Sequence, residues 1–463
     1  MNSALLKNAT IITASQTIKA DILARDGIIE QIGRHLDAAD AQSFDLTGRY
    51  LLPGGIDVHT HLDMPLGDIR SCDDFTTGTV AAACGGTTTI IDYAAHAHGE
   101  TMAQGLDAWH QRAEGKAVID YGFHLTLSEF TDRTLRDMER IVEAGVTSFK
   151  VFTAYPGRMM IDDAAIFRVL QQAKEIGALV CVHCENGQVI DALIHDALAA
   201  GQTAPKYHPL TRPAIAEREA AHRVISLAEM ADAPVYIVHV SSGAAIEQIA
   251  QARLRGVPVY AETCPQYLFL SAELYDGIEF EGAKYVMSPP LREKLDQDAL
   301  WQAVRNRMID VIGTDHCPFH FQSQKTLGRD DFTKIPNGGP GIETRLNLMF
   351  TGGVSEQRIS LNHFVDIVST QPAKLFGLYP QKGEIAPGSD ADFVVINPEH
   401  ETFISAITQH SIVDYSLYEG MRVKGTPEKV FARGELIVEN GRFLGKPGAG
   451  RFLKRQRSSH YAR

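Results

Sequence analysis

The segment Gly54–His61 has the sequence GGIDVHTH, an apolar run that ends in two histidines. In a β-strand, residues two positions apart face the same side, so the side chains of His59 and His61 are expected to project together. Two imidazoles that share one face can bind one metal ion. The segment therefore predicts a buried strand whose carboxyl end carries metal ligands.

Seven later segments have the same short apolar texture, and helix-like segments such as 162–176 and 215–230 separate them. The eight predicted strands are Gly55–His61, Thr87–Tyr93, Asp120–Leu127, Ser148–Thr153, Leu179–His183, Val235–Val240, Val257–Thr263 and Ile309–Asp315. Eight strand–helix units favour an α/β fold with a parallel (β/α)8 barrel, a TIM barrel, over a doubly wound sheet.

Both ends of the chain differ from this middle part, because they contain short alternating strands broken by turn signals such as Asp26-Gly27 and Asn440-Gly441. They predict one small β-sandwich domain built from residues 1–52 and 378–440, beside a catalytic barrel at 53–377. Residues 441–463 are predicted to form a C-terminal arm that contacts another subunit. Its basic residues are Arg451, Lys454, Arg455, Arg457 and Arg463.

Composition excludes several classes of protein. The 463 residues carry a formal net charge of −13, which argues against a nucleic-acid partner. No run of about 18 apolar residues occurs, so no membrane span is expected, and the N-terminus lacks the pattern of a signal peptide. The six cysteines are scattered, as is typical of thiols in a reducing compartment. We therefore expect a cytoplasmic protein.

Three other predicted strands also end in a residue that can bind a metal. His183 ends the fifth strand, His239 lies near the end of the sixth, and Asp315 ends the eighth. A single buried histidine is usually a packed core residue, but three such strand ends beside the two histidines of the first strand are hard to attribute to packing. Nitrogen and carboxylate ligands of this kind suit zinc, with manganese, iron or cobalt as substitutes. The predicted active site is therefore the carboxyl mouth of the barrel.

Lys150 lies between apolar residues inside the fourth predicted strand. An unpaired ammonium group is costly to bury, so this lysine needs an explanation. One explanation is a salt bridge. The other is that burial depresses the pKa of Lys150, the free amine reacts with carbon dioxide, and the resulting carbamate bridges two metal ions.

Seven motifs distributed over nearly the whole chain carry a resemblance to a known family. They are GGIDVHTH at 54–61, SFKVF at 148–152, VHCEN at 182–186, IVHVS at 237–241, ETCPQY at 262–267, GTDHCP at 313–318 and PNGGP at 336–340. In these motifs the chain resembles the D-hydantoinase and dihydropyrimidinase family of cyclic amidohydrolases. Every metal-ligand position of that family is filled.

The resemblance implies an enzyme that opens the ring of 5-substituted hydantoins or dihydropyrimidines and releases N-carbamoyl amino acids. It also implies a homotetramer and two divalent metal ions. In this assignment the ligands of one ion are His59, His61 and Asp315, those of the other are His183 and His239, and carboxylated Lys150 bridges the two.

A mechanism follows from these expectations. A hydroxide shared by the two metal ions would be the nucleophile at neutral pH. Asp315 beside it can take the proton during attack and deliver it to the departing ring nitrogen. The resemblance implies that the Tyr155 hydroxyl donates to the oxyanion and that the backbone at Ser288 and Asn337 grips the cyclic amide. The recognised part of the substrate is then the amide edge of a cyclic ureide or imide.

The loops after the first and fourth predicted strands are expected to surround the ring substituent. Their apolar side chains favour a phenyl or alkyl group over a charged one. Asp63 stands where dihydroorotases carry an arginine, which disfavours an acidic substrate. An allantoinase-type activity stays open, and a non-enzymatic scaffold homologue is the alternative from a different class. The predicted substituent pocket contains Met64, Leu66, Phe152 and Met159.

Overall fold

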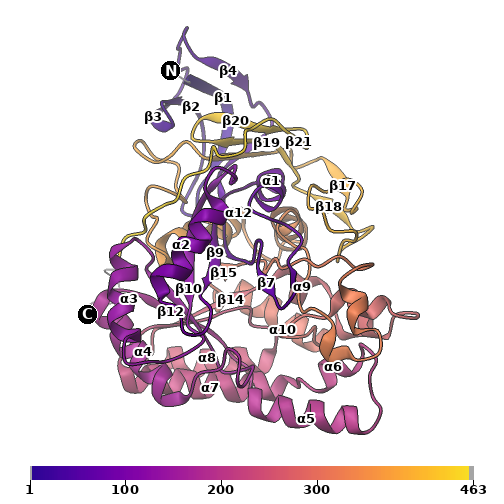
Figure 1. Cartoon of the computed structure of the whole chain (residues 1–463). Helices are drawn as coiled ribbons and strands as arrows, with labels where there is room; N and C mark the ends of the chain where they lie inside the picture. Colours follow the sequence, from indigo (N-terminus) through magenta and orange to yellow (C-terminus); the bar gives the residue numbers. More distant parts are fainter. Residues whose placement is uncertain (1–2, 458–463) are drawn as a thin grey trace.

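The computed structural model describes residues 3–457. Its lower part in Figure 1 is an eight-stranded parallel barrel, and its upper part is a sheet with strands from both ends of the sequence, drawn in indigo and yellow. The barrel strands are β6 (Gly55–Thr60), β9 (Thr87–Ala95), β10 (Asp120–Thr126), β11 (Ser148–Phe152), β12 (Leu179–His183), β13 (Val235–Ile237), β14 (Val259–Thr263) and β15 (Val311–Ile312). All eight predicted barrel strands are present, so the predicted fold class is confirmed.

β13 and β15 each stop three residues earlier at the carboxyl end than predicted. Just beyond each strand end, a buried carboxylate accepts a backbone N–H. Glu262 accepts from His239 at 3.0 Å, and Asp57 accepts from Thr314 at 3.2 Å. The chain therefore leaves the regular ladder where the predicted metal ligands begin, and His239 and Asp315 follow irregular backbone rather than a strand.

β6 and β15 close the barrel with little backbone pairing. Within residues 3–457, the edge between them has a single bridge, from Thr60 to His316. The fully buried Arg345 spans the same seam, because its Nη1 donates to the carbonyls of Ile56 in β6 and Ile312 in β15, at 2.9 and 3.0 Å. Side chains therefore hold the barrel closed where the ladder is weakest.

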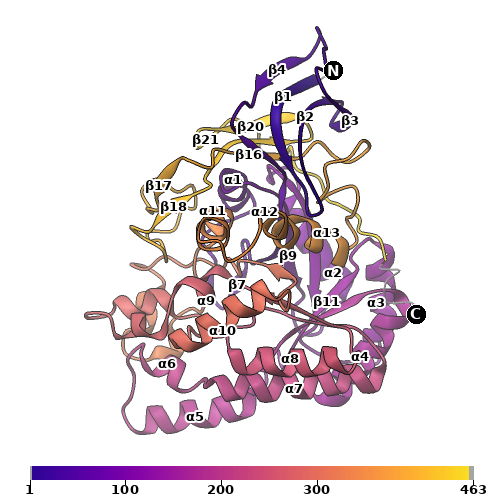
Figure 2. The same cartoon turned by 180° about the vertical axis from the view of Figure 1, so that it is seen from behind.

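Helices surround the barrel, and Figures 1 and 2 show α3, α4, α7 and α8 along its outside. The Asp162 side chain caps α4 by accepting the N–H of Ala165, and Gly177 ends the helix in a left-handed conformation. No helix among residues 3–457 is long and apolar enough to cross a membrane. The helices are α1 (Thr77–Cys84), α2 (Met102–Ala113), α3 (Thr134–Glu143), α4 (Asp163–Ile176), α5 (Gly187–Ala199), α6 (Tyr207–Leu210), α7 (Ala214–Ala231), α8 (Gly243–Leu254), α9 (Pro265–Phe269), α10 (Lys294–Arg305), α11 (Arg345–Met349), α12 (Leu361–Val365) and α13 (Gln371–Leu375).

The smaller domain is a nine-stranded sheet that packs against itself. The ring of Phe44 in β4 lies 5.0 Å from that of Phe431 in β19, although β1, β5 and β16 separate these strands in the sheet. The two halves thus enclose one core, as in a sandwich. Its strands are β1 (Ser3–Ile12), β2 (Thr17–Arg25), β3 (Ile28–Gly33), β4 (Gln42–Asp45), β5 (Tyr50–Pro53), β16 (Phe393–Ile396), β19 (Pro427–Ala432), β20 (Glu435–Glu439) and β21 (Arg442–Phe443); two hairpins lie outside it, β7 (Pro65–Leu66) with β8 (Ile69–Arg70) and β17 (Glu401–Phe403) with β18 (Arg422–Lys424).

Lys382 connects this domain to the barrel. Its buried ammonium lies 2.7 Å from carboxylate oxygens of Asp120 in β10 and Asp392, and 2.9 Å from Asp390. Three carboxylates around one cation hold its pKa well above the usual range, although burial opposes the charge. We keep as a proposal the division into 1–52 with 378–440, 53–377 and 441–463. Strand β21 begins at Arg442, just beyond residue 440, where the proposed small domain ends.

The described part of the C-terminal arm packs on its own barrel. Leu453 is buried and belongs to the cluster of apolar side chains inside the barrel. The buried guanidinium of Arg455 donates to the carbonyl of Phe123, in the middle of β10, and to the hydroxyl of Ser148, the first residue of β11. The arm beyond Arg457 lies outside the described residues. Its contact with another subunit stays a prediction.

Deleting residues 451–463 is expected to destabilise the barrel. Burial of one leucine side chain contributes about 1.5–3 kcal/mol, and β10 and β11 would lose the contacts of Arg455 as well. Thermal unfolding with light scattering would report the midpoint and the assembly state together. Exchange of the exposed Arg457 for Ala is the control and should change neither. A deletion variant with the parental midpoint would contradict a stabilising role.

Candidate active site

His59, His61 and Asp315 meet at the carboxyl mouth of the barrel. The Nε2 atoms of both histidines lie 3.1 and 3.0 Å from the same carboxylate oxygen of Asp315. Potential ligand atoms of the three residues all lie within 4.8 Å of one another. Strands β6 and β15 bring them together across the barrel seam. The arrangement can hold one metal ion.

His183 and His239 form a second pair beside the first. Nδ1 of His183 lies 2.9 Å from Nε2 of His239, so the two ring nitrogens face each other. The rings of His59 and His239 have centroids 5.3 Å apart, which places the pairs side by side. Nδ1 of His239 is buried without a hydrogen-bond partner in the described structure. Five of the six predicted ligands thus form two adjacent groups.

Lys150, the sixth, projects from β11 into the same space. Its ammonium lies 4.6 Å from the ring centre of Tyr93 and 5.2 Å from that of Phe152. Among residues 3–457 it has neither an ion-pair nor a hydrogen-bond partner, so the salt-bridge explanation finds no support. Burial lowers the pKa of Lys150. The lysine therefore has the environment in which a free amine, and then a carbamate, can form.

Two buried carboxylates that the sequence reasoning missed orient these histidines. Glu262 lies 2.5 Å from Nδ1 of His59, and Glu185 lies 2.8 Å from Nε2 of His183. A carboxylate on one ring nitrogen leaves the other nitrogen free to bind a metal and makes it more basic. The signal was present in the sequence, since Glu262 lies within the seventh predicted strand and Glu185 follows His183 by two residues.

The electrostatics of the mouth favour a bound cation. Burial opposes a charge on His59, but the carboxylates of Glu262 and Asp315 outweigh it and raise its pKa to about 9. Burial also opposes ionisation of Asp315, yet the two histidines hold its pKa well below the usual range. A site that stabilises both a buried cation and a buried carboxylate suits a divalent metal. The residues present therefore fit a metal centre.

Three residues of the cavity wall have strained backbone conformations. Tyr155, His239 and Asp315 have φ values of 63°, 38° and 53°, in the left-handed region that side chains other than glycine seldom adopt. Such conformations cost about 1–3 kcal/mol each and are typical of functional sites. They turn each side chain toward the mouth just after its strand ends.

All the predicted site residues line one cavity of about 180 Å³. Arg158, which the sequence reasoning missed, lines it too, and its exposed guanidinium has no ion-pair partner within residues 3–457. It lies in the loop that carries Tyr155, and only the folded loop shows that it faces the cavity. The predicted residues in this wall are His59, His61, Lys150, His183, His239, Asp315, Tyr155, Ser288, Asn337, Met64, Leu66, Phe152 and Met159.

Ser288 and Asn337 line this cavity, and each has one backbone group without a partner among the described residues. The carbonyl of Ser288 and the N–H of Asn337 make no hydrogen bond to any described residue, whereas backbone groups next to them do. A free acceptor and a free donor in one wall match the N–H and C=O of a cyclic amide. The geometry is therefore suited to an amide edge.

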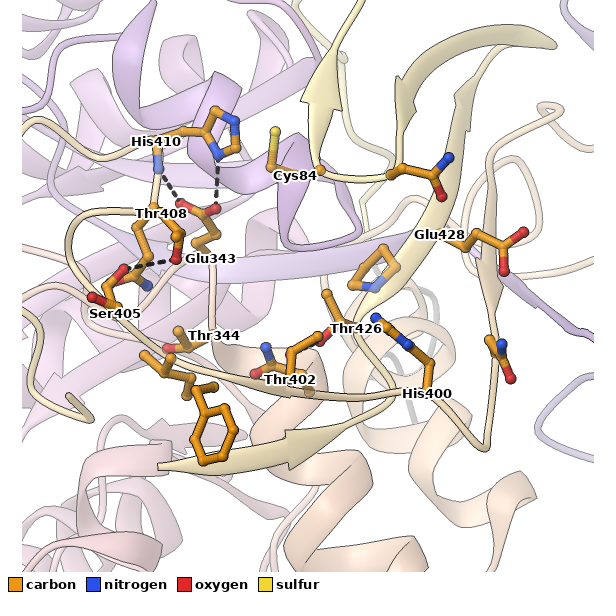
Figure 3. A pocket seen from close by; sticks show the side chains of 18 residues that line it. Cys84, Glu343, Thr344, His400, Thr402, Ser405, Thr408, His410, Thr426 and Glu428 are labelled. Atoms are coloured by element: carbon orange, nitrogen blue, oxygen red, sulfur yellow. Dashed lines mark hydrogen bonds and ion pairs between the residues drawn. The ribbon is translucent and has the colours of Figure 1, made fainter. Parts of the chain in front are cut away.

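A larger cavity of about 430 Å³ lies between β17 and the end of α1 (Figure 3). There the carboxylate of Glu343 accepts from the backbone N–H of His410 at 2.7 Å and lies 2.8 Å from its Nδ1. None of the predicted ligands lines it. The described residues around it contain no group of three ligand side chains close enough to share a metal ion. The chemistry therefore belongs to the smaller cavity.

Residues 50–437 match the model of the amidohydrolase family. The chain belongs to the amidohydrolase family. This amidohydrolase is 54% identical over 452 residues to a D-hydantoinase of Geobacillus stearothermophilus, covering 97% of this chain and 96% of that one. It is 48% identical to a D-hydantoinase of Streptomyces coelicolor, covering 97% of both chains. The crystal structure of a dihydropyrimidinase from Brevibacillus agri superposes with a TM-score of 0.97, at 53% identity over 98% of this chain and 99% of that one. The predicted family is confirmed.

Exchange of Glu262 for Gln is expected to weaken metal binding by this amidohydrolase. Loss of the carboxylate behind a ligating histidine typically lowers metal affinity about 10–100-fold. Metal content after dialysis against a graded chelator series measures the effect. Glu217→Gln is a matched control, because Glu217 is an equally buried carboxylate that binds Ser241 and Arg292 instead of a predicted ligand. Equal metal retention by both variants would exclude the role of Glu262.

Proposed function

We propose that this cyclic amidohydrolase opens the ring of 5-substituted hydantoins and dihydropyrimidines and releases N-carbamoyl amino acids. The observation that carries the proposal is the cavity wall, where the predicted ligands lie together with Ser288 and Asn337, whose backbone carbonyl and N–H have no partner among the described residues. The names of the similar proteins, D-hydantoinase and dihydropyrimidinase, support the same substrate class. A hydrolysis panel of dihydrouracil, hydantoin, phenylhydantoin, allantoin and dihydroorotate tests it directly.

The metal centre of the proposal has two divalent ions, with zinc as the first candidate and manganese, cobalt or iron as alternatives. We assign the first to His59, His61 and Asp315 and the second to His183 and His239. Carboxylated Lys150 would be the shared ligand, and its unpaired, buried amine supports this role. When bound, such ions supply a hydroxide nucleophile at neutral pH and polarise the ring carbonyl.

Residues of the chain hold the substrate, transfer the proton and stabilise the developing negative charge. The Ser288 carbonyl and the Asn337 N–H hold the amide edge, which fixes the scissile bond in the mouth of the barrel. Asp315 accepts the proton of the attacking water and returns it to the ring nitrogen that leaves. The Tyr155 hydroxyl donates to the carbonyl oxygen under attack as negative charge develops there. Each of these groups acts on atoms common to hydantoins and dihydropyrimidines.

Discrimination among substrates falls to the loops around the ring substituent. Met64, Leu66, Phe152 and Met159 supply an apolar wall, which supports phenyl and alkyl substituents. Arg158 at the same wall adds one unpaired donor, so an allantoinase-type activity on a polar ureido arm is the second candidate. Comparing phenylhydantoin with allantoin separates the two.

We also propose a homotetramer in the cytoplasm. The resemblance to hydantoinases supports the assembly, and six cysteines without a disulfide support a reducing compartment. Small cyclic ureides or imides are the proposed external partners.

Exchange of Lys150 for Ala is expected to abolish ring opening and to lower metal content, because the shared ligand is lost. Acetate or propionate should restore part of both by supplying a carboxylate in the vacated space. Metal analysis and hydrolysis assays with increasing acetate measure the two effects. Near-normal turnover without added acid would contradict the carbamate.

Exchange of Met159 for Asp is expected to depress phenylhydantoin hydrolysis far more than dihydrouracil hydrolysis. Each apolar methylene group in contact contributes about 0.8 kcal/mol, so a phenyl group gains about one to two orders of magnitude in kcat/KM over bare hydantoin. Met160→Asp is the matched control, because the neighbouring Met160 is not among the described residues that line the cavity. Equal losses on both substrates would mean that Met159 supports the loop and does not contact the substituent.

A further inference from the structure

Lys325 is a second buried lysine without an acidic partner, and the mechanism above does not use it. Its side chain is fully buried, and no described carboxylate lies within ion-pair distance. Its Nζ donates to the carbonyls of Val286 and Gly338, at 2.9 and 2.6 Å. Burying a lysine side chain costs free energy unless hydrogen bonds inside the protein replace those it made to water. The two carbonyls that Lys325 binds therefore indicate its role in the structure.

The two carbonyls belong to two different segments, and each segment contains one of the two cavity-lining residues with an unpaired backbone group, Ser288 or Asn337. Val286 precedes Ser288 by two residues, and Gly338 follows Asn337 directly. The segments also touch each other through one direct bond, from the N–H of Gly338 to the carbonyl of Val286 at 3.0 Å. Lys325 thus connects the segment that carries the acceptor to the segment that carries the donor.

Gly338 has no freedom to compensate for loss of this contact. Its φ is 129°, and a Cβ atom at this position would lie 2.4 Å from the carbonyl oxygen of Cys317. The residue is therefore pressed against the chain next to Asp315, with its N–H bound to Val286 and its carbonyl bound to Lys325. Both peptide groups that follow Asn337 are fixed by these contacts.

The Ser288 segment is fixed in the same way on its other carbonyls. The ring of His208 binds the carbonyl of Met287 through Nε2 at 2.8 Å, and the Tyr267 hydroxyl donates to the carbonyl of Pro289 at 2.8 Å. With Lys325 on Val286, the carbonyls on both sides of Ser288 are bound by buried side chains. Only the carbonyl of Ser288 remains free for a ligand in this stretch.

We propose that Lys325 is a positioning residue that sets the distance and orientation between the Ser288 carbonyl and the Asn337 N–H. This inference rests on the proposed function, because it concerns the grip on the cyclic amide edge. A single Nζ that donates to a carbonyl of each segment keeps the two segments in register. The grip then acts on the ground state and the transition state alike, so its loss appears mainly in KM.

The test is the variant Lys325→Met in the metal-loaded enzyme, since methionine has a similar length and no donor. For a ring substrate that the parent enzyme hydrolyses, kcat/KM should fall about 10–100-fold, mainly through a rise in KM, with unchanged metal content. Selectivity against the same ring methylated on its amide nitrogen should shrink about tenfold, because the Ser288 carbonyl no longer meets the N–H in register.

Thr370→Val is the matched control. The Thr370 hydroxyl donates to the carbonyl of Gly383 at 2.6 Å and is buried, but it does not line the cavity. This variant should retain the KM and the selectivity of the parent. If Lys325→Met does not fold, Lys325→Gln is the second variant, because glutamine keeps a donor group. A selectivity lower than that of the parent but not fully lost then supports the proposal.

Parental KM and selectivity in Lys325→Met or Lys325→Gln would overturn the positioning role. So would a loss confined to kcat with reduced metal content. Failure of the proposed function looks different, because the parent enzyme itself would then hydrolyse no ring of the panel.

Discussion

The predicted metal-ligand set depends on one buried carboxylate, that of Asp57. Its Oδ1 accepts the backbone N–H of His59 at 3.1 Å and that of Thr314 at 3.2 Å, and its Oδ2 accepts the Thr314 hydroxyl at 2.6 Å. These bonds join the first barrel strand to the last where the ladder between them is almost absent. They also fix the residue before Asp315 against the backbone of His59. A carboxylate at the seam thus helps to close the barrel and brings two predicted ligands, His59 and Asp315, to one point.

Charges buried around the mouth are costly, and the structure offsets the cost in different ways. A carboxylate oxygen of Glu185 lies 2.8 Å from His183 and 3.2 Å from Arg212, so both side chains share its negative charge. The guanidinium of Arg345 donates to backbone carbonyls at the seam. Lys150 alone among the proposed ligands has no polar contact within the described residues, although it lies in the middle of the cluster. That contrast supports the proposal that Lys150 serves a ligand and does not stabilise the fold.

Local sequence was a good guide to the barrel. Short apolar segments predicted all eight strands, and the predicted ligands at or near their ends line one cavity. It was a poor guide to the last residues of β13 and β15, since contacts with distant carboxylates decide where those strands stop. Glu262 is 203 positions from His59 in sequence, and no local pattern shows that these two side chains meet. The described part of the arm packs on its own barrel, and its expected contact with another subunit stays a prediction.

The sequence by itself determined the alternation of strands and helices, the apolar faces and the residue types at the strand ends, because these follow from the periodicity of the backbone. Only the tertiary structure decided how distant segments meet: the unpaired acceptor at Ser288 and donor at Asn337, the place of Arg158 in the cavity wall, and the link that Lys325 makes between two loops. Those features depend on hydrogen bonds left unmade or completed across the fold. Such bonds join groups that are close in space but far apart in the sequence, so the sequence alone does not show that they meet.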